Sequence, residues 1–335
     1  MLKYIIKRLL IAVIILLGVS VIIYSLVRMM PSDFVDNKYK EQLQNGSISQ
    51  EDIDHFKELY GLSDNSFSGI VKGYFNWLGN LIKGDLGRSF KYEKPVAQVI
   101  GENMWVSFAI AIIATILQFL IAIPLGIVSA TKQYSAADYI VTVFTMIGIS
   151  LPTYFFGAIA IKVFAVDLGW FPYGGLISAT ASYPETFAGF MEKLGDISYH
   201  LVLPIFVSVV LSLGGLMRYT RTNTLEVLGA DYIRTARAKG LSEKTVIYKH
   251  AFRNTLIPLA TLLAGILPSL FGGMMITEQV FGIPGIGNLA YQALTEADIP
   301  FVMGYNMFLA ILTVIGTLLS DIMYSIVDPR VKLTK

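Results

Sequence analysis

Six long runs without a charged side chain constrain the fold of this chain more than any other feature of its sequence. About 20 consecutive apolar residues cross the roughly 30 Å hydrocarbon core of a bilayer as one α-helix. Runs of about that length or more lie at residues 9–27, 104–131, 139–161, 197–217, 255–277 and 299–320. A helix satisfies its own backbone hydrogen bonds in lipid, so each run is compatible with a helical span. The sequence therefore predicts an all-α polytopic membrane protein with six transmembrane helices.

The composition supports a membrane protein and excludes several other classes. Only 15% of the 335 residues are charged, whereas soluble chains average about 25%. The net charge of +2 is too small to indicate a nucleic-acid partner. The absence of cysteine removes disulfides, thiolate metal sites and thiol catalysis together.

The first apolar run is interpreted as a retained anchor. Lys3, Lys7 and Arg8 precede it, as basic residues precede the core of a signal peptide. Its apolar core is too long for a signal peptide, however, and no A-x-A-like cleavage site follows. We therefore expect residues 1–30 to form an N-terminal transmembrane anchor helix.

Basic residues in short loops predict the orientation, because they resist translocation across the membrane. The two chain ends and the loop after the fourth run carry many Lys and Arg residues, whereas residues 278–298 carry none. Both termini, and the loop at residues 218–254, are therefore predicted to be cytoplasmic.

The organisation follows from this topology. Residues 31–103 form an extracytoplasmic cap loop, and residues 104–335 form a five-helix core that contains the loop at 218–254. In the cap, SQED at residues 49–52 resembles a capping box, and an apolar stripe and Gly61 follow it. Residues 74–82 predict an amphipathic helix with Trp77 at the membrane interface.

Several weaker signals indicate no catalytic, metal or cofactor site. The three histidines are scattered and lack metal-ligand spacing. Residues 282–287, GIPGIG, are glycine-rich but lack the phosphate-loop pattern, which occurs nowhere in the chain, so this chain should not bind ATP by such a loop. They predict a turn in a loop that dips back into the membrane.

Isolated residues within the runs leave alternatives open. Lys162 lies near the end of the third run. This terminal position favours the interpretation that its side chain snorkels to the headgroups over a functional role. Asp321 near the end of the sixth run is ambiguous. Glycines and prolines such as Gly126, Pro152 and Gly214 allow either close helix packing or kinked, movable helices.

Residues 231–258, DYIRTARAKGLSEKTVIYKHAFRNTLIP, form a polar, basic stretch between two apolar runs. Asp231 at the front and basic residues behind it match the dipole of a short helix, and Gly240 is a suitable stop. Ser242 can cap a second helix that has Glu243 in its first turn and runs toward the membrane. The stretch therefore predicts two helices joined by a turn.

Three interpretations of this stretch compete. It is a basic loop that only sets topology, a DNA-binding helix-turn-helix, or a docking helix for a soluble partner. Attachment to membrane helices on both sides disfavours DNA binding, and the other two remain open. In the docking interpretation, Ala236 lies one turn from Tyr232 and from Gly240, so this small face is expected to approach the partner closely.

Ordered motifs over nearly the whole chain resemble the oligopeptide/dipeptide/nickel permease family of ABC importers, and its B-type subunit in particular. They are KYIIKRLL (3–10), GVS (18–20), WLGNLIKGDLGRS (77–89), PVAQVI (95–100), IPLGIVSA (123–130), LEVLGADYIRTARAKGLSEKTVIYKHAFRNTLIP (225–258), EQVFGIPGIGNL (278–289) and SDIMYSIVDPR (320–330). The chain departs from the family pattern at residues 31–46, where PSDFVDNKYKEQLQNG replaces a short PGDP-like segment.

The resemblance implies the ABC importer type I permease fold and a non-enzymatic membrane subunit that forms half of a pathway for oligopeptides or dipeptides. The implied partners are a C-type permease subunit, two ATP-binding subunits and an extracytoplasmic peptide-binding protein. The implied location is a bacterial or archaeal cell membrane, with lipid around the spans. The implied ATPase-coupling helix, between spans four and five, comprises Asp231, Tyr232, Arg234, Thr235, Ala236, Arg237, Ala238, Lys239 and Gly240.

Other functions remain as alternatives. Nickel or another small solute can replace the peptide as cargo within the same family. A self-sufficient secondary transporter or channel is a different class, as is a membrane receptor or scaffold. Proton-coupled carriers usually place Asp, Glu or His within their spans, and the central runs of this sequence are almost bare of them. No residue is assigned to the substrate path.

Overall fold

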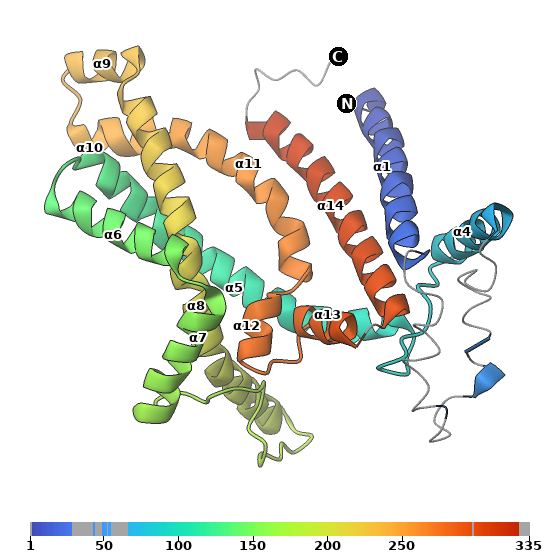
Figure 1. The fold of residues 1–335 in the computed structure, drawn as a ribbon. Helices are drawn as coiled ribbons and strands as arrows, with labels where there is room; N and C mark the ends of the chain where they lie inside the picture. The colour runs from blue at the N-terminus through green and yellow to red at the C-terminus, as the bar shows by residue number, and fades with distance from the viewer. Residues whose placement is uncertain are drawn as a thin grey trace. The chain divides into compact units, whose positions relative to one another are not determined.

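The computed structural model describes residues 2–28, 43, 49–51, 53, 54, 66–296 and 298–327. The described residues are organised as helices without strands, apart from an isolated bridge between Arg88 and Pro95 (Figure 1). The all-α prediction is confirmed. Asp52 of the predicted capping box, Gly61 and most of the 31–46 segment lie outside the described residues.

The helices follow one another along the chain with short connections in most places. In chain order they are α1 (Leu2–Arg28), α4 (Phe67–Ile82), α5 (Val96–Thr131), α6 (Ala136–Ser150), α7 (Thr153–Ala160), η1 (Ile161–Asp167), α8 (Phe187–Leu228), α9 (Asp231–Ala238), α10 (Glu243–Thr245), η2 (Val246–Ala251), α11 (Phe252–Phe271), α12 (Met275–Val280), α13 (Ile286–Thr295) and α14 (Ile299–Val327). The elements η1 and η2 are π-helices.

Four of the described helices are long and apolar enough to cross a membrane, namely α1, α5, α8 and α14. The pair formed by α6 and the continuous α7–η1 segment is a fifth candidate if it is counted as one span. The sixth span, expected at residues 255–277, stays a prediction, as does the cytoplasmic location of both termini.

The third apolar run forms two helical segments that meet at an angle of 106° rather than one straight helix. Leu151 ends α6 in an extended conformation, and Pro152 is the N-cap of α7. Proline restricts the residue before it to extended conformations, which ends a helix there. The glycines and prolines within the apolar runs are compatible with either close helix packing or kinked helices. At Pro152 the structure has a kink.

The chain divides into two compact units, and the first contains Met1–Glu102 and Gln292–Val314. Its apolar cluster joins Tyr24 near the end of α1, Trp77 of α4, and Ile299, Met303 and Met307 at the start of α14. The predicted amphipathic helix exists as α4, but the prediction that the Trp77 side chain faces the membrane interface is wrong. This side chain is only 5% exposed because α1 and α14 cover it.

The second unit contains Asn103–Tyr291 and Ile315–Lys335, and α8 is its longest helix. Helix α8 packs closely on α6 at its own Gly214 and on α5 at Gly126 of that helix. A Cβ added at Gly214 would lie 2.6 Å from the carbonyl oxygen of Thr145 in α6, and one at Gly126 of α5 would lie 2.7 Å from the Cβ of Thr220. At both positions glycine allows helices to approach closely. The division of the chain predicted at residues 30 and 103 stays a prediction.

Candidate functional site

The polar stretch between α8 and α11 forms a helical hairpin, hereafter the 231–251 hairpin, which consists of α9, α10 and η2. Gly240 has a φ of +75°, in the left-handed region that glycine adopts readily, and it follows the end of α9. The Ser242 hydroxyl accepts a hydrogen bond from the main-chain N–H of Thr245 at 3.4 Å and caps α10. The predicted stop and cap are both confirmed. In Figure 1 this hairpin lies at one end of α8, and the residues before α8 lie at the other.

A small apolar core holds the hairpin together. Ile233 and Ala236 of α9 are buried against Val246 and Ala251 of η2. Ala236 is 6% exposed, so the expectation that its side chain faces a partner is wrong. The i, i+3 spacing puts Ile233 and Ala236 on one face of α9, and that face packs on the second arm of the same hairpin.

An ion pair joins the two arms on the outside. The Arg237 guanidinium donates to Glu243 through Nη2 at 2.6 Å and through Nε at 3.2 Å. The hydrogen bond from Arg237 holds the pKa of the Glu243 carboxyl below its usual value. Both side chains remain about half exposed, so the pair contributes at most about 1 kcal/mol.

The remaining predicted coupling residues form an exposed surface. These residues are Asp231, Tyr232, Arg234, Thr235, Arg237, Ala238, Lys239 and Gly240. The ion pair between Asp231 and Arg234, at 3.6 Å, is weak because both side chains are mostly in solvent. The Tyr232 ring is 46% exposed and supplies apolar area. The structure thus brings eight of the nine predicted residues to the surface and buries one.

A partly buried ion pair lies at the base of the hairpin. Arg221, in the last turns of α8, donates to both carboxylate oxygens of Asp138 in α6, at 2.9 and 3.0 Å. Ser129 of α5 also donates to Asp138. Three membrane helices are therefore tied together next to the point where α8 leads into the hairpin. In the sequence, Arg221 is only one of the basic residues of the loop at 218–254, and Asp138 is too distant in sequence to be recognised as its partner.

A second missed group lies in the loop after α11. Glu278 of α12 is fully buried, and its carboxylate accepts hydrogen bonds from the Ser107 hydroxyl at 2.6 Å and from the main-chain N–H groups of Met274 and Asn288 at 2.9 Å. Ser107 in turn accepts from the main-chain N–H of Ile286, the first residue of α13. The carboxylate therefore joins α5, α12 and α13.

Glycines make room for this carboxylate. A Cβ added at Gly285 would lie 2.4 Å from the Glu278 carboxyl carbon, and one at Gly287 would lie 3.0 Å from its Oε2. The predicted turn is confirmed at residues 281–285, where the main chain connects α12 to α13, and the glycines at 285 and 287 have a specific steric reason. That this loop dips back into the membrane stays a prediction. The signal in the sequence was the spacing of these glycines after a single acidic residue, EQVFGIPGIG.

A third carboxylate anchors the loop between η1 and α8. Asp196 of α8 accepts hydrogen bonds from the main-chain N–H and hydroxyl of Ser178, at 2.6 and 2.8 Å, and from the hydroxyl of Tyr183. The bond to Asp196 raises the pKa of Tyr183 to about 12.

Lys162, whose side chain is expected to snorkel to the headgroups, is exposed and forms an ion pair with Asp167 at 2.8 Å.

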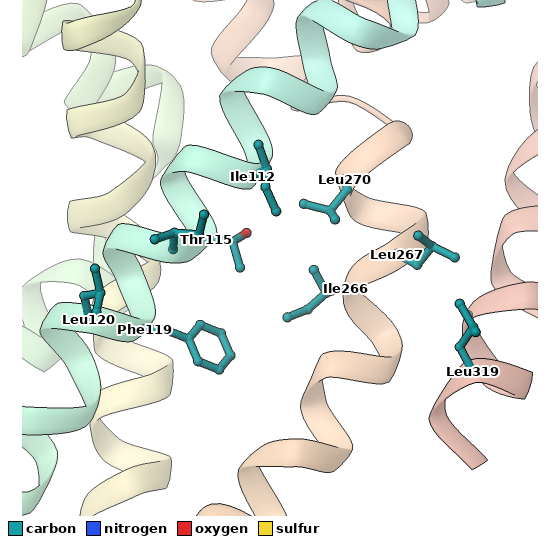
Figure 2. A pocket seen from close by; sticks show the side chains of 10 residues that line it. Ile112, Thr115, Phe119, Leu120, Ile266, Leu267, Leu270 and Leu319 are labelled. Carbon is teal, nitrogen blue, oxygen red and sulfur yellow. The ribbon is translucent and has the colours of Figure 1, made fainter. Parts of the chain in front are cut away.

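An apolar cavity of about 450 Å³ lies between α5, α11 and α14 (Figure 2). Ile112 and Phe119 of α5 face Ile266 and Leu270 of α11 across it, as Figure 2 shows. Among the described residues that line it, Thr115 supplies the one polar side chain, and none is charged. This lining therefore offers no charged group to a peptide terminus or a metal ion.

Within the described residues, no group of three or more His, Cys, Asp or Glu side chains could hold a metal ion. His200 is buried, and its Nδ1 lies 2.9 Å from the main-chain oxygen of Asp196. This contact makes His200 part of the packing at the start of α8. The expected absence of metal and cofactor stays a prediction.

Comparison with known proteins places the chain in a family. Residues 122–333 match the family described as binding-protein-dependent transport system inner membrane component. Residues 1–111 match the N-terminal membrane component of the same kind of system. The chain belongs to this family. The resemblance to ABC importer permease subunits, inferred from the ordered motifs, is confirmed, and the chain is a multi-pass membrane component of such a transport system.

Curated relatives match over the full length of this permease component. The oligopeptide transport system permease protein AppB of Bacillus subtilis (strain 168) is 38% identical over 99% of this chain and 100% of its own length. The dipeptide transport system permease protein DppB of Alkalihalophilus pseudofirmus is 32% identical over 99% and 100%. A solved structure of the MetNI methionine ABC transporter, in an inward-facing conformation, is 18% identical with a TM-score of 0.48, over 69% of this chain and 97% of that chain.

Proposed function

We propose that this chain is the transmembrane subunit of an ATP-driven importer and forms half of a translocation pathway for oligopeptides or dipeptides. The observation that carries this proposal is the full-length similarity to relatives named as peptide permeases. The other subunits are a C-type permease, two ATP-binding subunits and an extracytoplasmic peptide-binding protein. The chain itself does not hydrolyse ATP.

We further propose that the 231–251 hairpin docks on an ATP-binding subunit, with α9 as the coupling helix. Three features support this. Its outer surface is polar and exposed, its two arms are fixed to each other by the Ile233 core and the Arg237–Glu243 pair, and it continues into α8 and α11 at its two ends. A surface fixed in this way transmits movement of the partner to the membrane helices, provided the partner favours one of their conformations.

Because Ala236 is buried, a substitution at this position does not test docking alone. A glutamate at Ala236 would be forced into the apolar core of the hairpin, so it would disturb the hairpin as well as the partner. Ala238 is also small and lies in the same helix, but its side chain is exposed. Ala238→Glu therefore adds bulk and charge to the proposed docking surface while leaving the core intact, and Ala238→Ser is the matched conservative variant.

We expect Ala238→Glu to express and insert as the parent does, to lose co-purification of the ATP-binding subunit, and to lose peptide uptake. Burying an unpaired carboxylate at the interface costs a few kcal/mol, roughly a hundredfold in affinity. Ala236→Glu should lower the thermal stability of the purified chain itself, which Ala238→Glu should not. If Ala238→Glu retains the ATP-binding subunit and transports normally, α9 is not the docking surface.

The orientation is tested with single cysteines, because the chain contains none. Ser182, in the loop before α8, and Lys239, after α9, are both exposed. An impermeant thiol reagent should label Ser182→Cys in intact cells and Lys239→Cys only after permeabilisation. The reverse pattern would contradict both the proposed topology and docking to a cytoplasmic ATPase.

The cargo and the source of energy are tested in reconstituted vesicles. ATP hydrolysis should require the ATP-binding subunits and should increase with peptide-loaded binding protein. Labelled di- and oligopeptides should be taken up, and nickel ions should neither enter nor compete. Nickel uptake would support the small-solute alternative, and ATP turnover by the isolated chain would contradict the proposal.

A further inference from the structure

Helix α4 (Phe67–Ile82) has three distinct faces, and its packed face determines its location. Tyr74 and Trp77 contact Tyr24 with ring centroids 5.6 and 5.9 Å apart, and Trp77 shares a buried cluster with Met303 and Met307 of α14. The Tyr74 hydroxyl also lies 2.8 Å from the Ser20 hydroxyl of α1. This face is covered by the protein itself.

The contacts on α1 and α14 place α4 at the ends of two candidate membrane spans. The candidate spans are Ile6–Leu26 in α1 and Ile299–Leu319 in α14. Tyr24 lies at the end of the first, and Met303 lies near the start of the second. The end of one span and the start of the other therefore meet at α4. In Figure 1, α4 lies beside the C-terminal end of α1.

A second face of α4 is apolar and exposed. Phe67, Val71 and Phe75 recur at intervals of four residues, and Ile82 follows two turns later on the same side. Phe67 is 83% exposed, Phe75 62% and Ile82 77%. Such a contiguous apolar stripe on a helix that is already packed on another side requires a separate apolar environment.

The third face of α4 is polar and basic. Lys72, Asn76 and Lys83 are exposed and follow one another around the helix on the side opposite to the packed cluster. Residues 66–84 include no Asp or Glu. The order around the helix is therefore protein, apolar stripe, basic face. That order fits a helix lying flat at a bilayer surface, with hydrocarbon below, phosphate groups and water above, and protein at one side.

We propose that α4 is an interfacial membrane helix, whose Phe67/Val71/Phe75/Ile82 stripe inserts into the acyl-chain region and whose Lys72 and Lys83 contact phospholipid phosphates. Near the same end of α1, Ile22 and Leu26 are likewise apolar and are each 61% exposed. The basic face complements the phosphate layer, and the contacts with the span ends set the depth. Trp77 serves as the protein-side anchor of this helix.

The test uses the complete importer in liposomes of phosphatidylcholine and phosphatidylglycerol. Nitroxide labels are attached to single cysteines at Phe75 on the stripe and Asn76 on the polar face, neighbours in sequence that point to different environments. Collision rates are measured with oxygen, which concentrates in the bilayer, and with a water-soluble nickel chelate. We expect oxygen to dominate at Phe75→Cys and the nickel chelate to dominate at Asn76→Cys.

Two results would overturn the proposal. If the nickel chelate reaches Phe75→Cys as freely as Asn76→Cys, the stripe faces water. If neither reagent reaches Phe75→Cys, another protein subunit covers the stripe. The same measurement at Val71 and Lys72 repeats the comparison one turn earlier, so a local distortion at one labelled site cannot account for the pattern.

Discussion

The two hairpins that flank α11 each contain a glutamate with defined partners, and they use it in opposite ways. In the 231–251 hairpin, Glu243 is 57% exposed and forms an ion pair with Arg237 across the outside. In the hairpin of α12 and α13, Glu278 is fully buried and is bound by neutral donors, without an ion pair among the described residues.

The difference shows which hairpin depends on its glutamate for its shape. Leaving one buried hydrogen-bond donor without a partner costs about 1–3 kcal/mol, and Glu278 serves three donors. An exposed ion pair contributes about 0–1 kcal/mol. The α12–α13 hairpin is therefore fixed by a polar centre, whereas the 231–251 hairpin is fixed by an apolar core and leaves its charges on the surface for a partner.

The largest loss of folding stability is expected from Glu278→Ala. The Ser107 hydroxyl and the main-chain N–H groups of Met274 and Asn288 would lose their acceptor inside the protein, at a cost of about 3 kcal/mol or more. The measurement is the thermal unfolding midpoint of the purified chain in detergent. Gln279→Ala, at the exposed neighbouring position, is the matched control and should leave the midpoint unchanged. Equal midpoints for both variants would remove the distinction between the two hairpins.

A smaller loss of folding stability is expected when one glycine in each hairpin is replaced by alanine. Gly285→Ala would place a methyl group 2.4 Å from the Glu278 carboxyl carbon, which forces the buried network to move and costs roughly 1–3 kcal/mol. Gly240→Ala meets open space, but its φ of +75° costs about 1–2 kcal/mol.

The two glycine variants should also differ in where they act. Hydrogen exchange should increase around α12 and α13 in Gly285→Ala and only around α9 and α10 in Gly240→Ala. Faster exchange across both hairpins in either variant would mean that they are coupled through α11 rather than independent.

The smallest effect is the pH dependence of the Arg237–Glu243 pair. The pKa of Glu243 is lowered in the folded protein, so its contribution to stability is fully present above the unfolded value of about 4.3. It is lost as the pH falls through the lower, folded pKa. Glu243→Gln should thus be less stable than the parent by tenths of a kcal/mol at pH 7, and equally stable in strong acid. A difference that persists in strong acid would assign Glu243 a role other than the ion pair.

Local chemistry explains what could be predicted from the sequence. The end of α9 at Gly240 and the cap at Ser242 depend on residues within four positions of each other, so the residue types suffice. The apolar runs predicted most of the candidate spans because the length and hydropathy of a span are properties of one continuous segment. The bend at Pro152 follows equally local chemistry, but a continuous apolar run does not show whether a proline bends a span or only interrupts its hydrogen bonding.

The remaining features depend on contacts between distant segments. Trp77 is suited to a membrane interface, and only the arrival of α1 and α14 places it inside the protein. Ala236 is small enough to face either a partner or Val246, and the folding of the second arm decides between them. The buried carboxylate of Glu278 accepts a hydrogen bond from Ser107, which lies far earlier in the chain. The glycines after Glu278 show that its surroundings are tight, but the spacing of neighbouring residues identifies none of these distant partners.

The length of α8 limits where the chain can gain or lose residues during evolution. Its 42 residues correspond to about 63 Å at 1.5 Å per residue, roughly twice the hydrocarbon thickness of a bilayer. One inserted residue would turn everything after it by about 100°, separating Arg221 from Asp138 and redirecting the exposed face of α9. Gene variants of this lineage should therefore accumulate insertions and deletions in the loop before Phe187, while α8 keeps a constant residue count.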